Sequence, residues 1–340
     1  MPRRLSNQIN QFLHSFKMLT FLQYVARDMQ FDIDVYVATV DGNDPVYLKK
    51  MEQRIREEHW GTNSESTGKQ RINDYGEIRL LLDSIEYNMP WVRRIHLCVH
   101  DGQIPVWVGE TAFFREKIKV HEHSSYFDSD IKLPTFNSFV IDTQIKNVPG
   151  LAEHFIFMEN DMFIPNPLSP NRFFATSGLP RLSCVLRDRA RFQRGLLWED
   201  VYLAENRLCS QVFGHLCYSE AKIPGIDHGP LPSLKSVLLE AHGLFENSIA
   251  RTKNHSFRHK GDISYYLFRL MHIYSGKFAR SRNKNFLCKV TNMPDTIGSY
   301  LKYDTVCLND DYQESHGETF ILETAQKIAN LKKGLRVLYN

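Results

Sequence analysis

The sequence predicts an α/β fold: a mainly parallel, Rossmann-like sheet flanked by helices, followed by a helical C-terminal part. Strand-like apolar runs alternate with amphipathic helical runs through the first half of the chain, as in consecutive βαβ units. Two of the strand-like runs, 32–40 and 154–158, end in acid and amide side chains. Because ligands of open α/β sheets bind at the carboxyl ends of the strands, we expect a site there.

The first half of the chain shows clear element boundaries. The strand at 32–40 runs into a dense turn signal at 41–45. Between 74 and 89 the apolar residues recur at helical spacing, and Pro90 ends that helix. The other elements expected here are a charged helix at 46–58, a polar loop at 59–73, strands at 94–100 and 117–122, and a helix at 137–148.

Beyond residue 180 the alternation is less regular. Helices are expected at 198–217, 233–245 and 319–335, and a strand at 305–309. This strand ends in Asn309-Asp310-Asp311, so it is a third strand end rich in amide and acid groups. The last helix, in residues 316–340, is expected to pack on the core.

Composition places the chain among ordinary globular proteins. Of its 340 residues, 42% are hydrophobic and 24% are charged. The net charge of +3, from 42 basic and 39 acidic residues, is too balanced to indicate nucleic-acid binding, and no nucleic-acid partner is expected. The six cysteines include no Cys-x-x-Cys pair, so they indicate neither a zinc site nor a disulfide framework and fit a cytosolic protein.

Residues 1–30 are predicted to form an amphipathic helix. Apolar side chains recur at helical spacing between Ile9 and Met29, with basic and amide side chains between them. Such a helix could lie on a membrane surface or a partner protein, or pack on the chain's own core. No run reaches the roughly 18 to 20 apolar residues of a spanning helix, and no signal-peptide h-region is seen. A cytoplasmic location is expected, with peripheral contact at the inner face of the membrane left open.

The strand that ends at Glu159-Asn160-Asp161 offers three oxygen-bearing side chains in succession. Oxygen ligands suit a hard divalent cation such as Mg²⁺, which usually arrives with phosphates. The pattern therefore predicts a metal-assisted site for a phosphorylated donor. An ordinary polar turn after a strand has the same composition, and that alternative stays open at this point.

Asp34 and Asp41, in and just after the first strand, are candidates for contact with a nucleotide. Neither the glycine spacing of a Rossmann fingerprint nor that of a P-loop is present, so the phosphates would need another cradle. The alternative is a buried strand aspartate satisfied by the backbone and a turn aspartate.

Two motifs in the second half carry basic or imidazole groups. Arg258-His259-Lys260 precedes an aromatic helical run, and basic groups before a helix N-terminus can bind phosphate. His228 lies next to Gly229 and Pro230, which restrict its backbone and suit a catalytic or metal-binding role. A plain turn is equally compatible with this second motif.

Four motif blocks follow one another at about residues 31–45, 71–175, 225–275 and 303–312. They contain Ile33-Asp34-Val35 and Val40-Asp41-Gly42; Glu77-Ile78-Arg79, Pro90-Trp91-Val92-Arg93 and Leu133-Pro134-Thr135-Phe136-Asn137-Ser138; His228 and Arg258-His259; and Cys307-Leu308-Asn309-Asp310. In this order they resemble the Stealth family of hexose-1-phosphate transferases. That family includes bacterial capsular and exopolysaccharide phosphotransferases and the catalytic subunit that makes the mannose-6-phosphate tag of lysosomal hydrolases.

The resemblance implies a GT-A-like nucleotide-sugar transferase domain over residues 31–315. It implies transfer of a hexose or N-acetylhexosamine 1-phosphate from a UDP-sugar to a hydroxyl of an acceptor glycan, with release of UMP. The acceptor would be an oligosaccharide or a growing polysaccharide, with lipid linkage left open, in capsular or cell-surface polysaccharide synthesis. Mg²⁺ or Mn²⁺ is the implied cofactor, and oligomerisation is left open.

The resemblance also implies roles for individual residues. Asp161, Asn309 and Asn160 would hold the cation, with Asp161 acting on the donor diphosphate. Arg79 and Arg258 would offset phosphoryl charge, and His228 or Asp34 would orient or deprotonate the acceptor hydroxyl. The residues expected to contact substrate are Asp41, Gly42, Asn137, Ser138, His259 and Lys260.

The resemblance has one notable departure. The family's Asn-Asp-Asp appears here as Glu159-Asn160-Asp161, so only the last acid matches directly. Two alternative functions stay open: a metal-dependent glycosyltransferase that releases UDP, which the same kind of donor site would serve, and a non-catalytic glycan-binding component of a polysaccharide assembly complex, with the altered Glu159-Asn160 indicating lost activity.

Overall fold

The central sheet has five strands in the order β3-β2-β1-β4-β9. In this computed structural model, residues 29–60, 64–214 and 221–339 are described; apart from residues 29 and 30, the predicted N-terminal helix lies outside them. The strands are β1 (Ile33–Thr39), β2 (Ile95–Val99), β3 (Ile118–Glu122), β4 (His154–Met158) and β9 (Leu231–Leu234). The first four are mutually parallel and β9 is antiparallel to β4. The predicted α/β fold with a mainly parallel sheet is confirmed.

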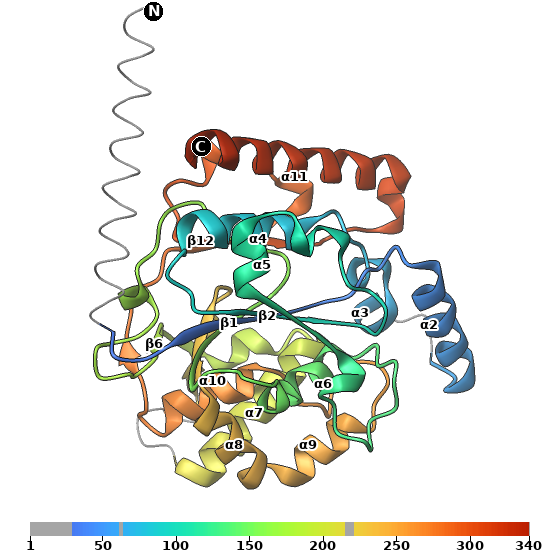
Figure 1. Ribbon diagram of the computed structural model, residues 1–340. Coiled ribbons are helices and arrows are strands. Elements are labelled where there is room, and N and C mark those ends of the chain that lie inside the picture. Colours follow the sequence, from blue (N-terminus) through green and yellow to red (C-terminus); the bar gives the residue numbers. More distant parts are fainter. Residues whose placement is uncertain (1–28, 61–63, 215–220, 340) are drawn as a thin grey trace, which may run out of the picture.

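Helices cover both faces of this sheet. The helices are α2 (Pro45–Glu57), α4 (Glu77–Asn88), α5 (Ala112–Lys117), α6 (Ser138–Thr143), α7 (Leu197–Phe213), α8 (Lys235–Leu244), α9 (Glu246–Lys253) and α10 (Tyr266–Tyr274). In Figure 1, β1 and β2 run between a layer that holds α4 and α5 and a layer that holds α6 to α10. Parallel strands buried on both faces read as nearly continuous apolar runs, which is why the strands could be predicted.

Side chains alternate across the sheet into two separate cores. On β4, Phe155 and Phe157 belong to the core formed with α8 and α10, whereas Ile156 and Met158 pack with α4. All four are buried. Because both faces of β4 are held by packing, its carboxyl end is fixed firmly in place.

A second, three-stranded sheet adjoins the first. Its order is β11 (Asn285–Lys289), β12 (Thr305–Asn309) and β5 (Met162–Phe163), with β5 antiparallel to β12. It shares a third core with the C-terminal helix α11 (Gly317–Tyr339) and with Leu80 of α4. Since β5 follows β4 directly, Glu159-Asn160-Asp161 lies at the junction of the two sheets.

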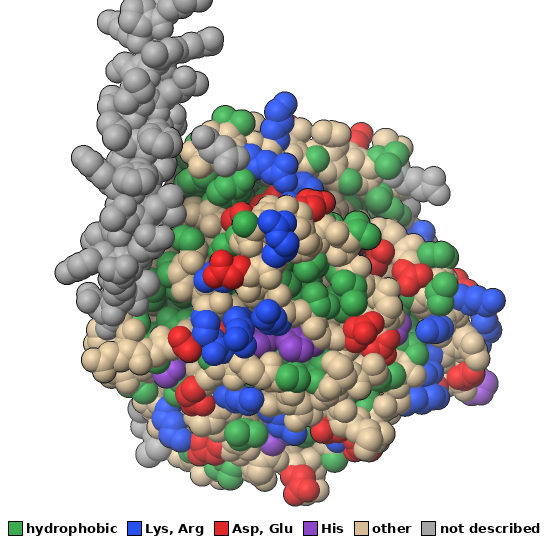
Figure 2. All heavy atoms as spheres, viewed as in Figure 1, with side chains coloured by type: hydrophobic (Ala, Val, Ile, Leu, Met, Phe, Trp, Pro, Cys, Tyr) green, Lys and Arg blue, Asp and Glu red, His purple; other side chains and the backbone are tan. Residues whose placement is uncertain are grey.

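The four remaining strands in the described part of the chain are short. β6 (Arg181–Leu182) pairs with β10 (Ala279–Arg280), and β7 (Leu186–Asp188) pairs with β8 (Lys222–Pro224). Basic and acidic side chains are interspersed over the face shown in Figure 2, in line with the balanced composition. Among the described helices, none combines the length and apolarity needed to cross a membrane.

Three predicted segments differ from the structure. The helix expected at 137–148 divides into α6 and the 3-10 turn η4 (Ile145–Asn147), and the loop at 59–73 contains the short helices α3 (Ser64–Thr67) and η1 (Lys69–Arg71). Residues 231–234 are a strand rather than turn and helix. Pro232 hides this strand in the sequence, but β9 is an edge strand, where a missing N–H donor is tolerated.

Candidate functional site

Three strand ends meet at the junction of the two sheets. The Asn160 side-chain amide donates to Thr39 Oγ1 at the end of β1 over 3.3 Å. The backbone N–H of Leu308, in β12, donates to the Asp161 carbonyl over 2.8 Å. Cys307 Sγ lies 3.4 and 3.5 Å from the two Asp161 carboxylate oxygens. The ends of β1, β4 and β12 therefore deliver their polar side chains to one place.

The acids at this junction are crowded. Ligand atoms of Glu159, Asp161 and Cys307 all lie within 4.8 Å of one another. Burial and the charge of Glu159 raise the pKa of Asp161 to about 8. Burial and Glu159 likewise raise the pKa of Asp142, on α6, to about 8. Burial raises the pKa of Glu77 to about 8, with Asp74 and Asp161 adding to the effect.

Such a cluster of carboxyl groups fits a divalent cation. Raised pKa values show that the folded chain holds these negative charges at a cost, which a bound cation would offset. The donors are mostly oxygens, as hard cations prefer. Because the Asn160 nitrogen binds Thr39, its carbonyl oxygen remains as a ligand atom. The residues present therefore fit Mg²⁺ or Mn²⁺.

Asn309 is placed to join this cluster. Side chains two apart on a strand share one face, so Asn309 lies on the face of β12 from which Cys307 meets Asp161. The next residue is fixed: the Asp310 carboxylate accepts from the Asn73 amide (3.0 Å) and the Tyr75 hydroxyl (3.1 Å). The end of β12 is thus anchored beside the acids.

Two guanidinium groups border the acids. Arg258 donates to Ser138 Oγ through Nε (2.9 Å) and Nη2 (2.6 Å) and lies over the Phe139 ring. Burial and the charge of Arg71 lower the pKa of Arg258 to about 10, against the opposite effect of Glu159 and Asp142. Burial also lowers the pKa of Arg71, opposed by Glu65, Glu159 and Asp310. Acids and arginines side by side are the groups that a cation and a phosphate require together.

Asn137 fixes the position of Ser138 and Arg258. Its carbonyl oxygen caps α6 by accepting from the Phe139 N–H (3.0 Å). Its amide nitrogen donates to the Asp262 carboxylate (2.8 Å) and to the carbonyls of His255 and Phe257. The fully buried Asn137 side chain therefore ties α6 to the segment that carries Arg258.

Comparison with known proteins relates part of the chain to a protein family. Residues 71–182 match the family model of Stealth protein conserved region 2. The chain is therefore similar to Stealth proteins over this conserved region. The matched region starts at Arg71 and includes Asn137, Ser138 and the Glu159-Asn160-Asp161 strand end, so it carries much of the candidate site.

Similarity extends to full-length relatives. An exopolysaccharide phosphotransferase of Nocardia farcinica is 30% identical over 70% of this chain and 45% of that protein. CpsY of Mycobacterium tuberculosis, another exopolysaccharide phosphotransferase, is 28% identical over 84% of the chain and 53% of its own length. The chain thus spans about half the length of these two Stealth relatives. WcwK, a capsular polysaccharide phosphotransferase of Streptococcus pneumoniae, is 28% identical over 88% of the chain and 96% of its own length.

Similarity to solved structures is weaker. The galactosyltransferase LgtC in complex with donor and acceptor sugar analogues aligns with a TM-score of 0.45 and 11% identity, covering 88% of this chain and 96% of that one.

Three further residues of the Stealth blocks lie on loops. His259 Nδ1 accepts from the Gly261 N–H (3.1 Å), and the exposed Lys260 forms no ion pair within the described ranges. His228 lies between β8 and β9, half-buried, and its ring has no hydrogen-bond partner among the residues that the structure describes. Its neighbour Asp227 is fixed by Asn285 (2.9 Å). The roles of these three residues stay predictions.

Arg79 points away from the acid cluster. Its guanidinium contacts Asp83 and Glu110 over 2.7 Å each and lies over the rings of Trp107 and Phe114. Two positions along an α-helix correspond to a rotation of about 200°, so Arg79 and Glu77 lie on opposite sides of α4. The structure therefore favours a role for Arg79 in holding α4 to the α5 layer.

Asp34 lies near the amino end of β1, away from the other acids. Its fully buried carboxylate accepts from Arg93 Nε (2.8 Å) and the Ala152 N–H (2.8 Å), and it lies 3.0 Å from His96 Nε2. Burial alone would raise the pKa of Asp34, but these hydrogen bonds lower it below its usual value of 3.8. This geometry favours a structural role over the catalytic one expected from the sequence.

Replacing Asp34 with asparagine should lower the free energy of unfolding by about 3 kcal/mol at neutral pH, because a buried partner charge is lost. Since the folded pKa is depressed, this contribution is fully present above pH 3.8 and is lost as pH falls through the lower folded pKa. Urea unfolding of both proteins across this pH range measures it. The control is Asp32→Asn, whose 67%-exposed side chain meets the same Arg93; an equal loss there would contradict the assignment.

The Asp41-Gly42 turn is held from two sides. Gln103 accepts from the Asp41 N–H (2.8 Å) and donates to the Asp41 carbonyl (3.2 Å). The backbone of Ile72 lies so close to Gly42 that a Cβ there would stand 1.3 Å from the Ile72 carbonyl oxygen. Only glycine fits this approach, which packs the turn after β1 against the segment that carries Arg71.

Gly42→Ala should therefore destabilise the protein by about 2 kcal/mol or more, since the backbone must shift to admit a methyl group. The shift would displace Asn73 and loosen its hold on Asp310. Thermal unfolding measures the loss. The matched control is Gly109→Ala, because nothing lies within 4 Å of a Cβ at Gly109. Equal melting temperatures for the two variants would rule out the close approach.

Sequence reasoning missed Arg71, Asp142 and Cys307 as members of the site. A usable signal existed for Asp142, which lies four positions after Ser138 on one predicted helix and so shares its face. For Arg71 and Cys307 the neighbours come from distant segments, and no local spacing reveals them.

Proposed function

We propose that the chain transfers a sugar 1-phosphate from a UDP-sugar to a hydroxyl of an acceptor glycan. A phosphodiester forms and UMP leaves, in the synthesis of a capsular or cell-surface polysaccharide. The observation that carries this proposal is the meeting of three strand ends, where Asp161 and Asn160 lie with Glu159 and the charges of Arg71 and Arg258 act on the same acids. The names of the Stealth relatives, exopolysaccharide and capsular polysaccharide phosphotransferases, support it.

The donor diphosphate would lie across the acids and arginines. Asp161, with Asn309 and Asn160, would hold Mg²⁺ or Mn²⁺, which when bound neutralises phosphate charge and orients the donor. Arg258 and Arg71 would donate hydrogen bonds to phosphoryl oxygens. Ser138 would aim the Arg258 guanidinium, with which it already shares two hydrogen bonds.

The acceptor hydroxyl would attack the phosphorus that carries the sugar. A new P–O bond forms there, the bond from that phosphorus to the bridging oxygen breaks, and UMP leaves with the electron pair. The hydroxyl proton passes to a base. His228 is the proposed base, because its ring has no hydrogen-bond partner in the described part of the chain, whereas Asp34 is enclosed at the far end of β1.

The test is incubation of the protein with a panel of UDP-sugars, Mg²⁺ or Mn²⁺, and oligosaccharide acceptors. The expected result is cation-dependent release of UMP together with a phosphodiester-linked product. Release of UDP with a glycosidic product would identify a glycosyltransferase instead. Donor binding without turnover would identify a non-catalytic component.

A further inference from the structure

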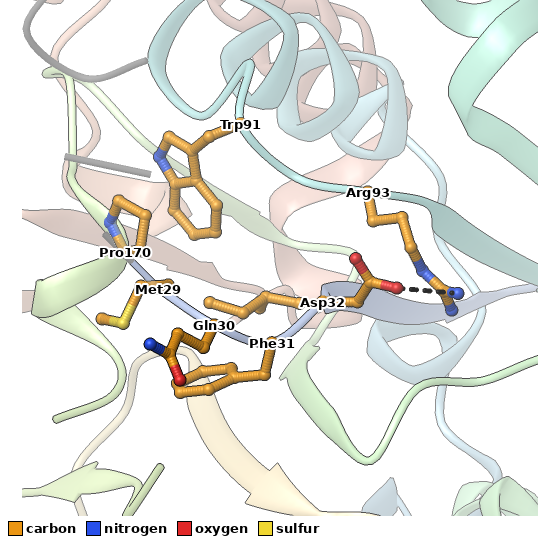
Figure 3. Close-up of a pocket in the computed structure, with 8 residues that line it drawn as sticks. Met29, Gln30, Phe31, Asp32, Trp91, Arg93 and Pro170 are labelled. Carbon is orange, nitrogen blue, oxygen red and sulfur yellow. Dashed lines mark ion pairs between the residues drawn. The ribbon is translucent and has the colours of Figure 1, made fainter. Parts of the chain in front are cut away.

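A pocket of about 370 Å³ opens at the amino edge of the central sheet, shown in Figure 3. Its lining comes from the chain leading into β1 and from the segments after α4 and around Pro170. Its volume lies in the range of small-molecule sites. The lining residues are Met29, Gln30, Phe31, Asp32, Ile33, Trp91, Arg93 and Pro170.

One wall of this pocket is an aromatic face that is fixed in place. The Trp91 indole N–H donates to the Leu168 carbonyl over 2.6 Å, and its ring packs against Phe173. The indole donor is thus already used, so what the half-buried ring offers the pocket is carbon surface. Phe31 is held in the same way by stacking on His154, with ring centroids 3.9 Å apart.

The lining also carries paired charges and an amide. Arg93 is oriented by Asp34 and the Gly150 carbonyl through Nε and Nη2, which leaves Nη1 facing Asp32 at 3.4 Å. The Asp32 side chain is 67% exposed and has spare acceptor capacity. The exposed Gln30 adds a donor and an acceptor.

This lining suits a hydroxyl-rich ligand that carries no negative charge. Arg93 is shared by the carboxylates of Asp34 and Asp32, so an anion such as phosphate gains no net attraction. A sugar ring combines an apolar C–H face with a rim of hydroxyl groups, which matches a lining of aromatic carbon surface, donors and acceptors. We propose that this pocket binds one sugar residue of the acceptor glycan; this role rests on the proposed function.

The pocket and the candidate transfer site lie at opposite ends of β1. Ile33, in its lining, is the first residue of β1, and Thr39, in the candidate site, is the last. Six residue steps along a strand span about 20 Å in a straight line. Because β1 is a central strand covered by helices on both faces, a glycan that reaches both places must follow the surface around the sheet, which takes a longer chain. A growing polysaccharide has that length, and the second contact would raise the local concentration of its reactive end.

Saturation-transfer difference NMR on the full-length protein tests the binding. The probes are the methyl glycosides of glucose, galactose, mannose, rhamnose, N-acetylglucosamine and N-acetylgalactosamine. At least one should bind, and Asp32→Ala should weaken it about tenfold through loss of a charge-assisted hydrogen bond. Glu52→Ala is the matched control. The Glu52 side chain is as exposed as that of Asp32, and it also has an arginine partner, Arg56 on the same helix, at 4.0 Å.

Binding should survive Asp161→Asn, which separates this pocket from the transfer site. Absence of binding by all six probes, or equal binding by wild type and Asp32→Ala, would overturn the proposal. With a working assay, Asp32→Ala should raise KM about tenfold more for a polysaccharide acceptor than for a disaccharide. If UMP is released but the KM effect of Asp32→Ala is the same for both acceptors, only the role of the pocket is wrong. If no UMP is released, the proposed function is wrong.

Discussion

Replacing Asp161 with asparagine is expected to reduce kcat for UMP release by at least about a hundredfold. The carboxylate lies at the meeting point of three strands, beside Glu159 and Cys307. An amide keeps the shape of the side chain but removes the charge that holds a cation in position. Steady-state release of UMP at saturating UDP-sugar and Mg²⁺ measures the loss.

The control for this prediction is Asp311→Asn. Asp311 follows the same strand, but its carboxylate accepts from the Thr291 hydroxyl (2.7 Å) and N–H (3.1 Å). Binding of Mn²⁺, followed by electron paramagnetic resonance, should weaken in Asp161→Asn and persist in the control. A near-normal turnover rate in Asp161→Asn would remove Asp161 from the mechanism.

The fold was predictable where burial dictates composition. β1, β2 and β4 are buried on both faces, and their nearly continuous apolar runs stand out in the sequence. β9 was missed because Pro232 reads as a turn signal, and only the strand order reveals that it lies at an edge. The end of α6 before Gln144 was missed because the apolar spacing continues beyond it.

The candidate site was predictable to the extent that strand direction determines it. Asp161 follows β4 and Asn309 is the last residue of β12, and the structure brings these two strand ends together. Asp34 is the second residue of β1, so it lies at the opposite edge of the sheet from these strand ends. Its residue type suits catalysis, but position along the strand decides which edge it reaches.

Helix faces are harder to assign from sequence. Arg79 and Glu77 are two positions apart on α4, and the sequence does not say which face of the helix meets the strand ends. In the structure the charge of Asp161 contributes to the raised pKa of Glu77, whereas Arg79 contacts Glu110. The partners that decide this lie 31 and more residues away along the chain.

The four motif blocks of the sequence form one connected network in the folded chain. Asn137 joins the second block to the third through Asp262. Asn73 joins the second to the fourth through Asp310. Gly42 packs the first against the second at Ile72. Much of what the motifs specify is therefore the joining of segments, and a small number of side chains are left for chemistry.

The variants Arg258→Ala and Arg79→Ala should differ in whether they lose activity or stability. Arg258→Ala is expected to lower kcat about a hundredfold, because a charged donor to the phosphoryl group is removed. Its stability should change little, since burial and Arg71 lower the pKa of Arg258 and the folded chain holds this charge at a cost. Steady-state kinetics and thermal unfolding of the same preparations measure both effects.

Arg79→Ala is the counterpart and should lower stability instead, by about 3 kcal/mol. Burial alone would lower the pKa of Arg79, but hydrogen bonds to Asp83 and Glu110 raise it, so folding gains from the charge. The folded fraction of Arg79→Ala should have a kcat close to that of the wild type. A hundredfold loss of kcat in Arg79→Ala with an unchanged melting temperature would contradict its structural assignment, because Arg79 would then act on the substrate.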